Sequence, residues 1–385
     1  MANALVGQRG GRRGALHVRT GLSTGSRPLL PTAGRGWPPT RRTPGVGGQA
    51  LGGRRSFPPC RLPVRGSGLG GEAEPLPRMC VVFGASPAVR EGKRELSGLG
   101  RMRLEDLPPV AGVRHRTVAT RGVSLHVAEA GDGPPLVLLH GWPQHWWSFR
   151  ALIPRLAERY RVIAPDLRGW GWSDAPPGDY AKTTFAADVL ALLDAEDLDR
   201  VRLVGHDWGG YAAFLLALQH PERVERVVAL DIAPPWRTPA HPGQLLFLPF
   251  ASYQFALATP WLGLRLMTSG RLVPLILRLG SGPRFRFGDD EVAAYTEPLR
   301  EPARAAASVA CYRTFLTREL VAQARRRNDL RVPALLLWGE TSLLRRIAGT
   351  SPGVPTEVIA GAGHFLAEEA PEAVLQIAEP FLARA

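Results

Sequence analysis

The segment LVGHDWGG at residues 203–210 constrains the fold of this chain more than any other. An apolar run ends there, an apolar helix-like stretch follows, and Asp207 stands with glycines two positions before and two after it. Strand-to-helix turns this tight leave no room for side chains at Gly205 and Gly209, and they lift the central side chain into a cleft at a helix N-terminus. An aspartate that merely caps a helix is the ordinary alternative. The buried strand and the paired glycines favour the sharp turn.

The pattern around this turn predicts an α/β fold. From Val113 onward, short apolar runs alternate with longer amphipathic stretches. The expected strands are a hairpin at 115–129 and runs at 134–141, 161–166, 201–206, 223–231, 332–339 and 356–362; the expected helices are 147–159, 183–195, 208–219 and 371–383. Such alternation indicates a mostly parallel central sheet flanked by helices, with catalytic groups at the carboxyl ends of strands.

Residues 232–331 interrupt the alternation with about a hundred mainly helix-like residues, far more than an ordinary connection. We expect a helical cap inserted in a core built from 102–231 and 332–385. The stretch 244–264 carries no charge. Its prolines and polar residues argue against a membrane span, which would also divide one sheet across a bilayer.

The first hundred residues differ from the rest in composition. They contain 16 Lys and Arg against 4 Asp and Glu, whereas the remainder has 32 against 30. They also hold 21 of the 43 glycines, so we expect residues 1–101 to be a disordered Gly/Arg/Pro-rich extension. A transit peptide, a nucleic-acid-binding tail and an over-extended reading frame with a start near Met102 all compete as explanations. The glycines and prolines, and the single lysine, favour the last.

Because the charge excess is confined to this extension, we expect neither nucleic acid nor a membrane as a partner of the folded part. Cys60, Cys80 and Cys311 are too few and too scattered for a disulfide framework or a zinc site. No apolar stretch typical of a secretion signal follows the early arginines. We therefore expect a cytoplasmic protein with no cofactor and no metal, and oligomeric state stays open.

An aspartate in place of serine at the turn changes the chemistry to expect. A carboxylate attacks esters poorly, but it displaces a strained or good leaving group at an sp³ carbon. The product would be an alkyl ester of Asp207, which water then hydrolyses with the help of a base and an oxyanion hole. This favours epoxides and alkyl halides over esters, lipids and peptides.

His364 is the expected base, because it lies in the loop after the last strand, where the fold places its histidine. The neighbouring His206 should point away from the cleft and have a structural role. The acid that orients His364 is less obvious. Its commoner position, three residues after Gly339, holds Ser342, which cannot orient an imidazolium. We assign Asp231, at the end of the strand next to the turn, and keep Glu340 in reserve.

The loop His140-Gly141-Trp142-Pro143 follows the third strand. Its backbone can supply one oxyanion N–H, from Trp142, and the residue after the nucleophile, Trp208, can supply the other.

From about Val113 to its end, the chain resembles the α/β-hydrolase fold superfamily, in its epoxide hydrolase and haloalkane dehalogenase branch. The segments HGWPQHWWSFR, DLRGWGWSD, GHDWGGYAAF and GHFLAEEAP carry the resemblance. Ser342 departs from most epoxide hydrolases. An acid at Asp231 is instead similar to fluoroacetate dehalogenases and some haloalkane dehalogenases.

The resemblance implies that cap tyrosines donate a proton to the opening ring oxygen. SYQF and CYRTF resemble the two tyrosine segments of epoxide hydrolases, which points to Tyr253 and Tyr312, with Tyr295 as a further candidate. A phenol supplies that proton without charging the pocket.

Dehalogenase features are incomplete. Trp208 matches one half of a halide clamp, but Trp142 stands where an asparagine is common, and Trp208 and Tyr211 replace the arginines that would bind a carboxylate. We therefore expect a small apolar epoxide and water as reactants. A haloalkane or haloacid dehalogenase stays an alternative, as does a catalytically degenerate binding protein, which Ser342 would support. The apolar substrate is inferred from four aromatic residues of the cap: Phe247, Phe250, Phe255 and Trp261.

Overall fold

The structure is a computed structural model that describes residues 102–120, 122–236, 248–348 and 353–384. The extension expected at 1–101 lies outside the described residues.

An eight-stranded sheet forms the centre of the described part, in the order β1-β2-β4-β3-β5-β6-β7-β8. Strands β1 and β2 form an antiparallel hairpin, β2 pairs antiparallel with β4, and all remaining pairs are parallel. The bounds are β1 Arg114–Ala119, β2 Ser124–Ala130, β3 Pro135–Leu139, β4 Arg161–Pro165, β5 Val201–His206, β6 Val224–Leu230, β7 Ala334–Gly339 and β8 Thr356–Ile359. The predicted α/β fold class is confirmed.

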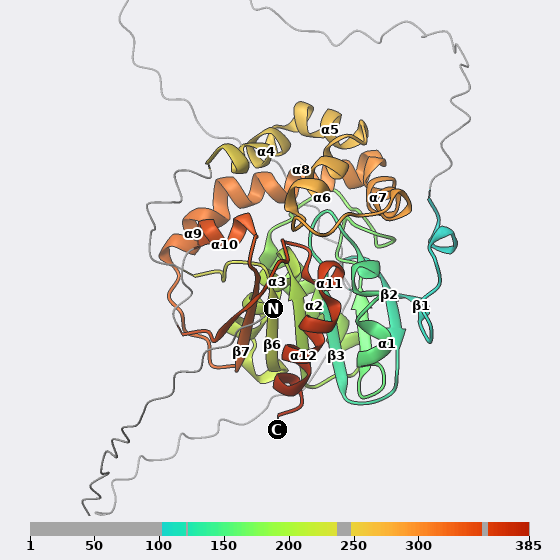
Figure 1. Cartoon of the computed structure of the whole chain (residues 1–385), viewed down its shortest axis with the longest axis vertical. Coiled ribbons are helices and arrows are strands. Elements are labelled where there is room, and N and C mark those ends of the chain that lie inside the picture. The colour runs from blue at the N-terminus through green and yellow to red at the C-terminus, as the bar shows by residue number, and fades with distance from the viewer. Residues whose placement is uncertain (1–101, 121, 237–247, 349–352, 385) are drawn as a thin grey trace, which may run out of the picture. The chain divides into compact units, whose positions relative to one another are not determined.

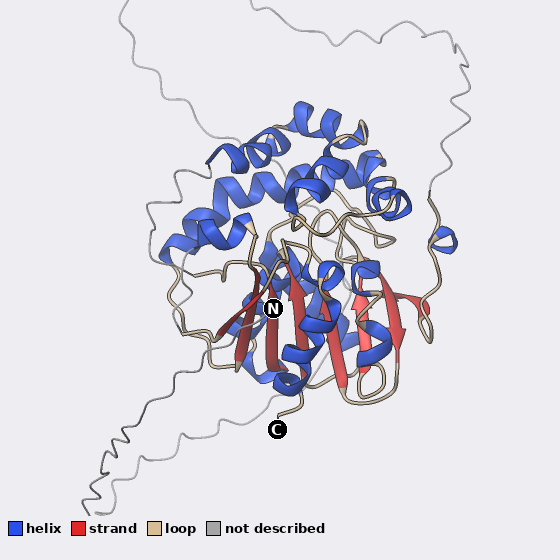
Figure 2. Cartoon of the chain, in the orientation of Figure 1, coloured by secondary structure: helices blue, strands red, loops and turns tan. Residues whose placement is uncertain are grey.

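Helices lie on both faces of this sheet (Figure 2). Helices α2 (Lys182–Ala195) and α3 (Trp208–Gln219) cover one face, and α12 (Pro371–Leu382) covers the other (Figure 1). The central strands are buried on both sides, as shown by Val137, Leu203 and Val228, which have no exposed surface. Double burial explains why these strands read as continuous apolar runs rather than as alternating ones. Four short helical elements also lie outside the inserted cap: η1 Leu104–Asp106, η3 Pro221–Arg223, α10 Leu343–Ala348 and α11 Leu366–Glu369.

The helix expected at 147–159 is wrong. The chain forms a short turn, η2 (Trp146–Phe149), and a single-turn helix, α1 (Ile153–Leu156). Pro154 has no backbone N–H, so it cannot donate to the carbonyl of Arg150 and the helical hydrogen-bond pattern breaks there.

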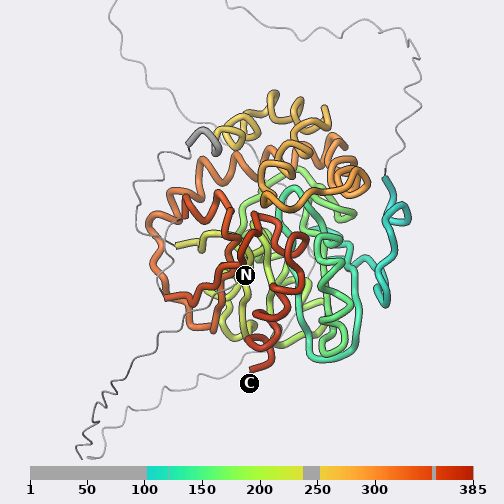
Figure 3. The backbone as a smooth tube through the Cα atoms, viewed as in Figure 1, coloured from blue at the N-terminus to red at the C-terminus, as the bar shows by residue number. Residues whose placement is uncertain are grey.

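The insertion between β6 and β7 is helical where the structure describes it. Its elements are α4 Leu248–Ala258, α5 Pro260–Thr268, α6 Leu272–Gly280, α7 Asp289–Thr296, η5 Pro298–Arg300, α8 Pro302–Thr314, the π-helical turn η6 Phe315–Glu319 and α9 Leu320–Arg325. These helices lie above the edge of the sheet where the parallel strands end, and the chain returns from them into β7 (Figures 1 and 3). Within the described ranges, no helix is both long and apolar enough to cross a membrane.

Candidate active site

The turn between β5 and α3 has the strained geometry that its sequence predicts. Asp207 has φ 49° and ψ −124°, a backbone conformation that residues other than glycine rarely adopt. A Cβ at Gly205 would lie 2.6 Å from the Cα of Gly210, and one at Gly209 would lie 2.1 Å from the carbonyl oxygen of Leu139. Only glycine fits at either position, so the local sequence forces the carboxylate of Asp207 out of the sheet edge.

Asp231 and His364 complete a triad with Asp207. Asp231 directly follows β6, which pairs in parallel with β5, so the two aspartates emerge at the same edge. Nδ1 of His364 lies 2.7 Å from Oδ2 of Asp231, and its Nε2 lies 3.8 Å from Oδ2 of Asp207. Burial alone would lower the pKa of His364, but the hydrogen bond to Asp231 and the charges of both aspartates outweigh it and raise that pKa.

Two further groups hold Asp231, and sequence reasoning missed both. The hydroxyl of Ser342 donates to Oδ2 at 2.6 Å, and the backbone N–H of Gly339 donates to Oδ1 at 3.0 Å. Asp231 has no exposed surface, so these donors and His364 satisfy a fully buried carboxylate. Ser342, which looked like a missing acid, instead supports the acid on the neighbouring strand. The sequence did contain a signal for this role, because Ser342 places a hydroxyl donor at the position where the acid of the triad is more commonly found.

The reserve and additional candidates lie elsewhere. Glu340 is exposed, and its carboxylate accepts the backbone N–H of Gly361 at 2.8 Å. Tyr295 is buried, but its hydroxyl donates to Glu368 rather than lining the cavity at Asp207. His206 does not line this cavity, and its Nε2 lies 2.9 Å from the carbonyl oxygen of His364. The structure therefore places neither Glu340 nor Tyr295 in the lining of the cavity that contains Asp207.

The loop after β3 places an N–H against Asp207. The backbone N–H of Trp142 donates to Oδ1 of Asp207 at 3.1 Å. Nε2 of His140 accepts the N–H of Leu167 at 2.9 Å and so fixes the start of this loop. Burial raises the pKa of Asp207, while the charge of His364 and backbone hydrogen bonds from Trp208 and Trp142 counteract part of that rise. Both N–H groups expected for an oxyanion hole thus face the carboxylate.

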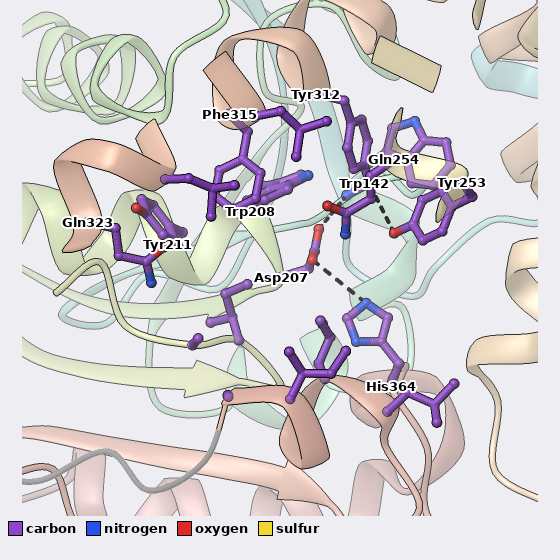
Figure 4. Close-up of a pocket in the computed structure, with 18 of the residues that line it drawn as sticks. Trp142, Asp207, Trp208, Tyr211, Tyr253, Gln254, Tyr312, Phe315, Gln323 and His364 are labelled. Atoms are coloured by element: carbon purple, nitrogen blue, oxygen red, sulfur yellow. Dashed lines mark hydrogen bonds and ion pairs between the residues drawn. The ribbon is translucent and has the colours of Figure 1, made fainter. Parts of the chain in front are cut away.

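Two cap tyrosines line the same cavity as Asp207 (Figure 4). Tyr253 comes from α4 and Tyr312 from α8, and their hydroxyl oxygens lie 3.5 Å apart. Burial raises the pKa of Tyr253 to about 12 and that of Tyr312 well above its ordinary value. Both phenols therefore keep their protons at neutral pH and can donate a hydrogen bond into the cavity.

The cavity that these groups line has a volume of about 600 Å³ and is mostly apolar. Its apolar lining includes Trp208, Ile232, Trp236, Ile276, Phe315 and Ile347. Of the four cap aromatics used as a sequence argument, the side chains of Phe255 and Trp261 are described. Phe255 lines the cavity although its side chain is 58% exposed, whereas Trp261 is 70% exposed and is not part of the lining. Phe247 and the side chain of Phe250 lie outside the described residues.

Comparisons with known proteins agree with this architecture. A sequence model described as the alpha/beta hydrolase fold matches residues 134–371. A soluble epoxide hydrolase of Corynebacterium sp. (strain C12) is 33% identical over 288 residues, covering 70% of this chain and 98% of that protein. Epoxide hydrolase 4 of Homo sapiens is 27% identical over 283 residues, covering 68% of this chain and 76% of that protein. The solved structure of epoxide hydrolase CorEH without ligand has a TM-score of 0.64 at 31% identity and covers 70% and 99% of the two chains.

The mostly parallel sheet, the sharp turn that carries Asp207 after β5, the loop that carries His364 after β8 and the inserted helices together define an α/β hydrolase. This chain belongs to that superfamily. Within it, the chain belongs to the epoxide hydrolase branch, as its sequence resemblance indicates.

Proposed function

We propose that the protein opens small apolar epoxides to diols through a covalent ester of Asp207. In the first step, one carboxylate oxygen of Asp207 attacks a ring carbon and the carbon–oxygen bond of the ring breaks. Charge develops on the leaving oxygen, which receives a proton or strong hydrogen bonds from Tyr253 and Tyr312. The apolar cavity holds the substituents of the ring.

In the second step, His364 takes a proton from water, and the resulting hydroxide attacks the carbonyl carbon of the ester. The N–H groups of Trp142 and Trp208 hold the negative oxygen of the tetrahedral intermediate. Asp231 orients His364 and stabilises its imidazolium form, as the third member of a triad does. As the intermediate collapses, the leaving alkoxide takes a proton from the imidazolium of His364, which releases the diol. The acid proton left on Asp207 returns to the tyrosine that gave its proton in the first step, and the carboxylate of Asp207 is restored.

The observation that carries this proposal is the pair of phenols above a nucleophilic carboxylate. Their hydroxyl oxygens are 3.5 Å apart, close enough to converge on one ring oxygen. An alkoxide needs such donors as it forms, whereas a halide leaves without a proton. The intact contacts between Asp207, His364 and Asp231 also argue against a degenerate binding protein.

The proposal is tested by mass spectrometry of the whole protein. The variant His364→Gln is incubated with a panel of terminal epoxides and alkyl halides. We expect a mass increase of one intact epoxide molecule, located on Asp207 by peptide fragmentation. The variant Asp207→Ala serves as the control and should gain no mass. An adduct formed only with alkyl halides would instead support dehalogenation.

One observation favours dehalogenation as a second candidate. The indole N–H of Trp208 is buried and lines the cavity without a hydrogen-bond partner among the described residues. A halide ion is a suitable acceptor for it. However, the second indole that faces this region, that of Trp142, donates instead to Ser308 at 3.2 Å. Of the two clamp positions, Trp208 and Trp142, only Trp208 therefore offers its indole N–H; the buried indole N–H of Trp236, which also lines the cavity, likewise has no hydrogen-bond partner among the described residues.

A further inference from the structure

Lys182 is a buried cation that the mechanism above does not use. It is the first residue of α2, and its side chain has no exposed surface. Burying an ammonium group is costly unless it is paired and hydrogen-bonded. Lys182 is satisfied on two sides: Nζ lies 2.7 Å from Oε2 of Glu319 and donates to the carbonyl oxygen of Cys311 at 3.1 Å. Both partners belong to the cap, so this contact joins cap and core.

The contacts of Lys182 lead to the residues proposed to open the ring. Cys311 directly precedes Tyr312, so the ammonium group fixes the backbone that carries this phenol. Glu319 ends the π-helical turn that follows Tyr312 along the same continuous helix. On the core side, Nζ lies 4.3 Å from the ring centre of Trp208, the residue after the nucleophile. The ammonium group of Lys182 therefore contacts the backbone next to Tyr312 in the cap and the indole ring of Trp208 in the core.

Glu319 acts on the core in a second way. Helix α2 has no side-chain cap of its own, and Oε1 of Glu319 accepts the backbone N–H of Lys182 at 2.7 Å. A carboxylate at this position also interacts favourably with the helix dipole. Glu319 of the cap therefore caps the N-terminus of α2 in the core, while Lys182, the first residue of α2, binds the cap through Glu319 and Cys311.

We propose that Lys182 is a positioning residue for epoxide opening, which sets Tyr312 and Trp208 relative to Asp207 by joining the π-helical turn of the cap to α2. This inference rests on the proposed function. Removal of the charge should slow formation of the ester, which needs the phenol in place. It should affect hydrolysis of the ester much less, because His364, Asp231 and the N–H of Trp142 do not contact this ion pair, and Lys182 meets Trp208 at its indole ring rather than at its backbone N–H.

The experiment measures the two steps separately. Ester formation is followed as mass gain of His364→Gln with 1,2-epoxyoctane, with and without the added substitution Lys182→Met. Ester decay is followed by rapid quench in chains that retain His364. The control is Arg168→Met, which breaks another largely buried ion pair to the same helix, Arg168 with Asp188, whose side chains are 13% and 9% exposed. Neither Arg168 nor Asp188 lines the cavity.

We expect Lys182→Met to slow ester formation about 10- to 100-fold, as a displaced catalytic group does, and to change ester decay by less than about threefold. Lys182→Arg should recover part of the lost rate, because it keeps a charge and donors. Arg168→Met should leave ester formation within about threefold of its parent, even where it lowers the melting temperature.

The double variant Lys182→Met/Glu319→Leu removes both charges of the pair and so leaves neither one buried and unpaired. If Lys182→Met fails to fold, the rate of ester formation is measured in this double variant instead. It should regain thermal stability without regaining the rate of ester formation. Recovery of that rate together with stability, or equal losses in Lys182→Met and Arg168→Met, would overturn the inference. Absence of any adduct in the His364→Gln parent would instead overturn the proposed function.

Discussion

Asp231 and His364 lie 2.7 Å apart, Oδ2 to Nδ1, although 133 positions separate them in the chain. The contact exists because Asp231 follows β6 and His364 follows β8, and both strands end at the edge where Asp207 stands. Asp231 has φ 46°, so its backbone, like that of Asp207, holds an unfavourable conformation. The fold therefore strains two backbone positions to bring these carboxylates to one histidine.

Replacing the acid should separate the two chemical steps. Asp231→Asn removes the charge that stabilises the imidazolium form of His364, so hydrolysis of the ester should slow roughly 10²- to 10⁴-fold. Formation of the ester should change much less, because it does not require His364 as a base. Rapid-quench kinetics should therefore show accumulation of the alkyl-enzyme. Glu340→Gln is the control, and an effect of this variant as large as that of Asp231→Asn would contradict the assignment.

The raised pKa of His364 predicts how turnover depends on pH. In the proposed mechanism only neutral His364 activates water, so kcat, where limited by hydrolysis, should rise with pH through a midpoint above the ordinary 6.5. Asp231→Asn should move the midpoint to lower pH. Because folding raises this pKa, the charged histidine also stabilises the fold, fully below pH 6.5 and progressively less as pH rises through the folded value. A kcat profile whose midpoint is unchanged in Asp231→Asn would contradict this.

The two cap phenols should act on ester formation. Tyr253→Phe and Tyr312→Phe remove donors to the ring oxygen, so each should slow single-turnover ester formation about 10- to 100-fold, and both together more. Tyr295→Phe is the matched control, because its hydroxyl donates to Glu368 away from the cavity. It should lower stability by about 1–3 kcal/mol without slowing the reaction. Equal rate losses in all three variants would refute the assignment of Tyr253 and Tyr312.

Close packing beneath Asp207 predicts a severe effect of one added methyl group. A Cβ at Gly141 would lie 2.3 Å from the Cβ of Asp207, so Gly141→Ala must displace Asp207 or the loop that carries Trp142. We expect ester formation to fall at least about 100-fold, since displacements near 1 Å have effects of this size. Gly122→Ala meets no atom closer than 4.0 Å and should react normally. Near-normal rates in Gly141→Ala would show that the loop adapts.

Local sequence was sufficient for the strands and the elbow, because both depend on short-range features. Apolar runs predict buried strands, and the glycines around Asp207 leave one possible turn. Asp231 could be assigned because the fold class places it at the same sheet edge. Pro154 is a helix breaker within the segment 147–159, which forms η2 and α1 instead of one helix.

Contacts between distant segments could not be predicted in the same way. The role of Ser342 depends on the parallel pairing of β6 with β7, which places its hydroxyl 2.6 Å from Asp231. The ion pair of Lys182 with Glu319 joins residues 137 positions apart. Tyr295 resembles the other cap tyrosines in type and location, and only the packing of α7 shows that its hydroxyl meets Glu368.

The most direct test of the covalent mechanism is a single turnover of the wild-type protein, in excess over 1,2-epoxyoctane, in H₂¹⁸O. The water oxygen enters the carbonyl carbon of the ester, so the label should appear in the carboxylate of Asp207 and the first diol should be unlabelled. Later turnovers should pass the label from Asp207 into the diol. Label in the diol of the first turnover, with none in Asp207, would mean that water attacks the epoxide directly and would contradict the covalent mechanism.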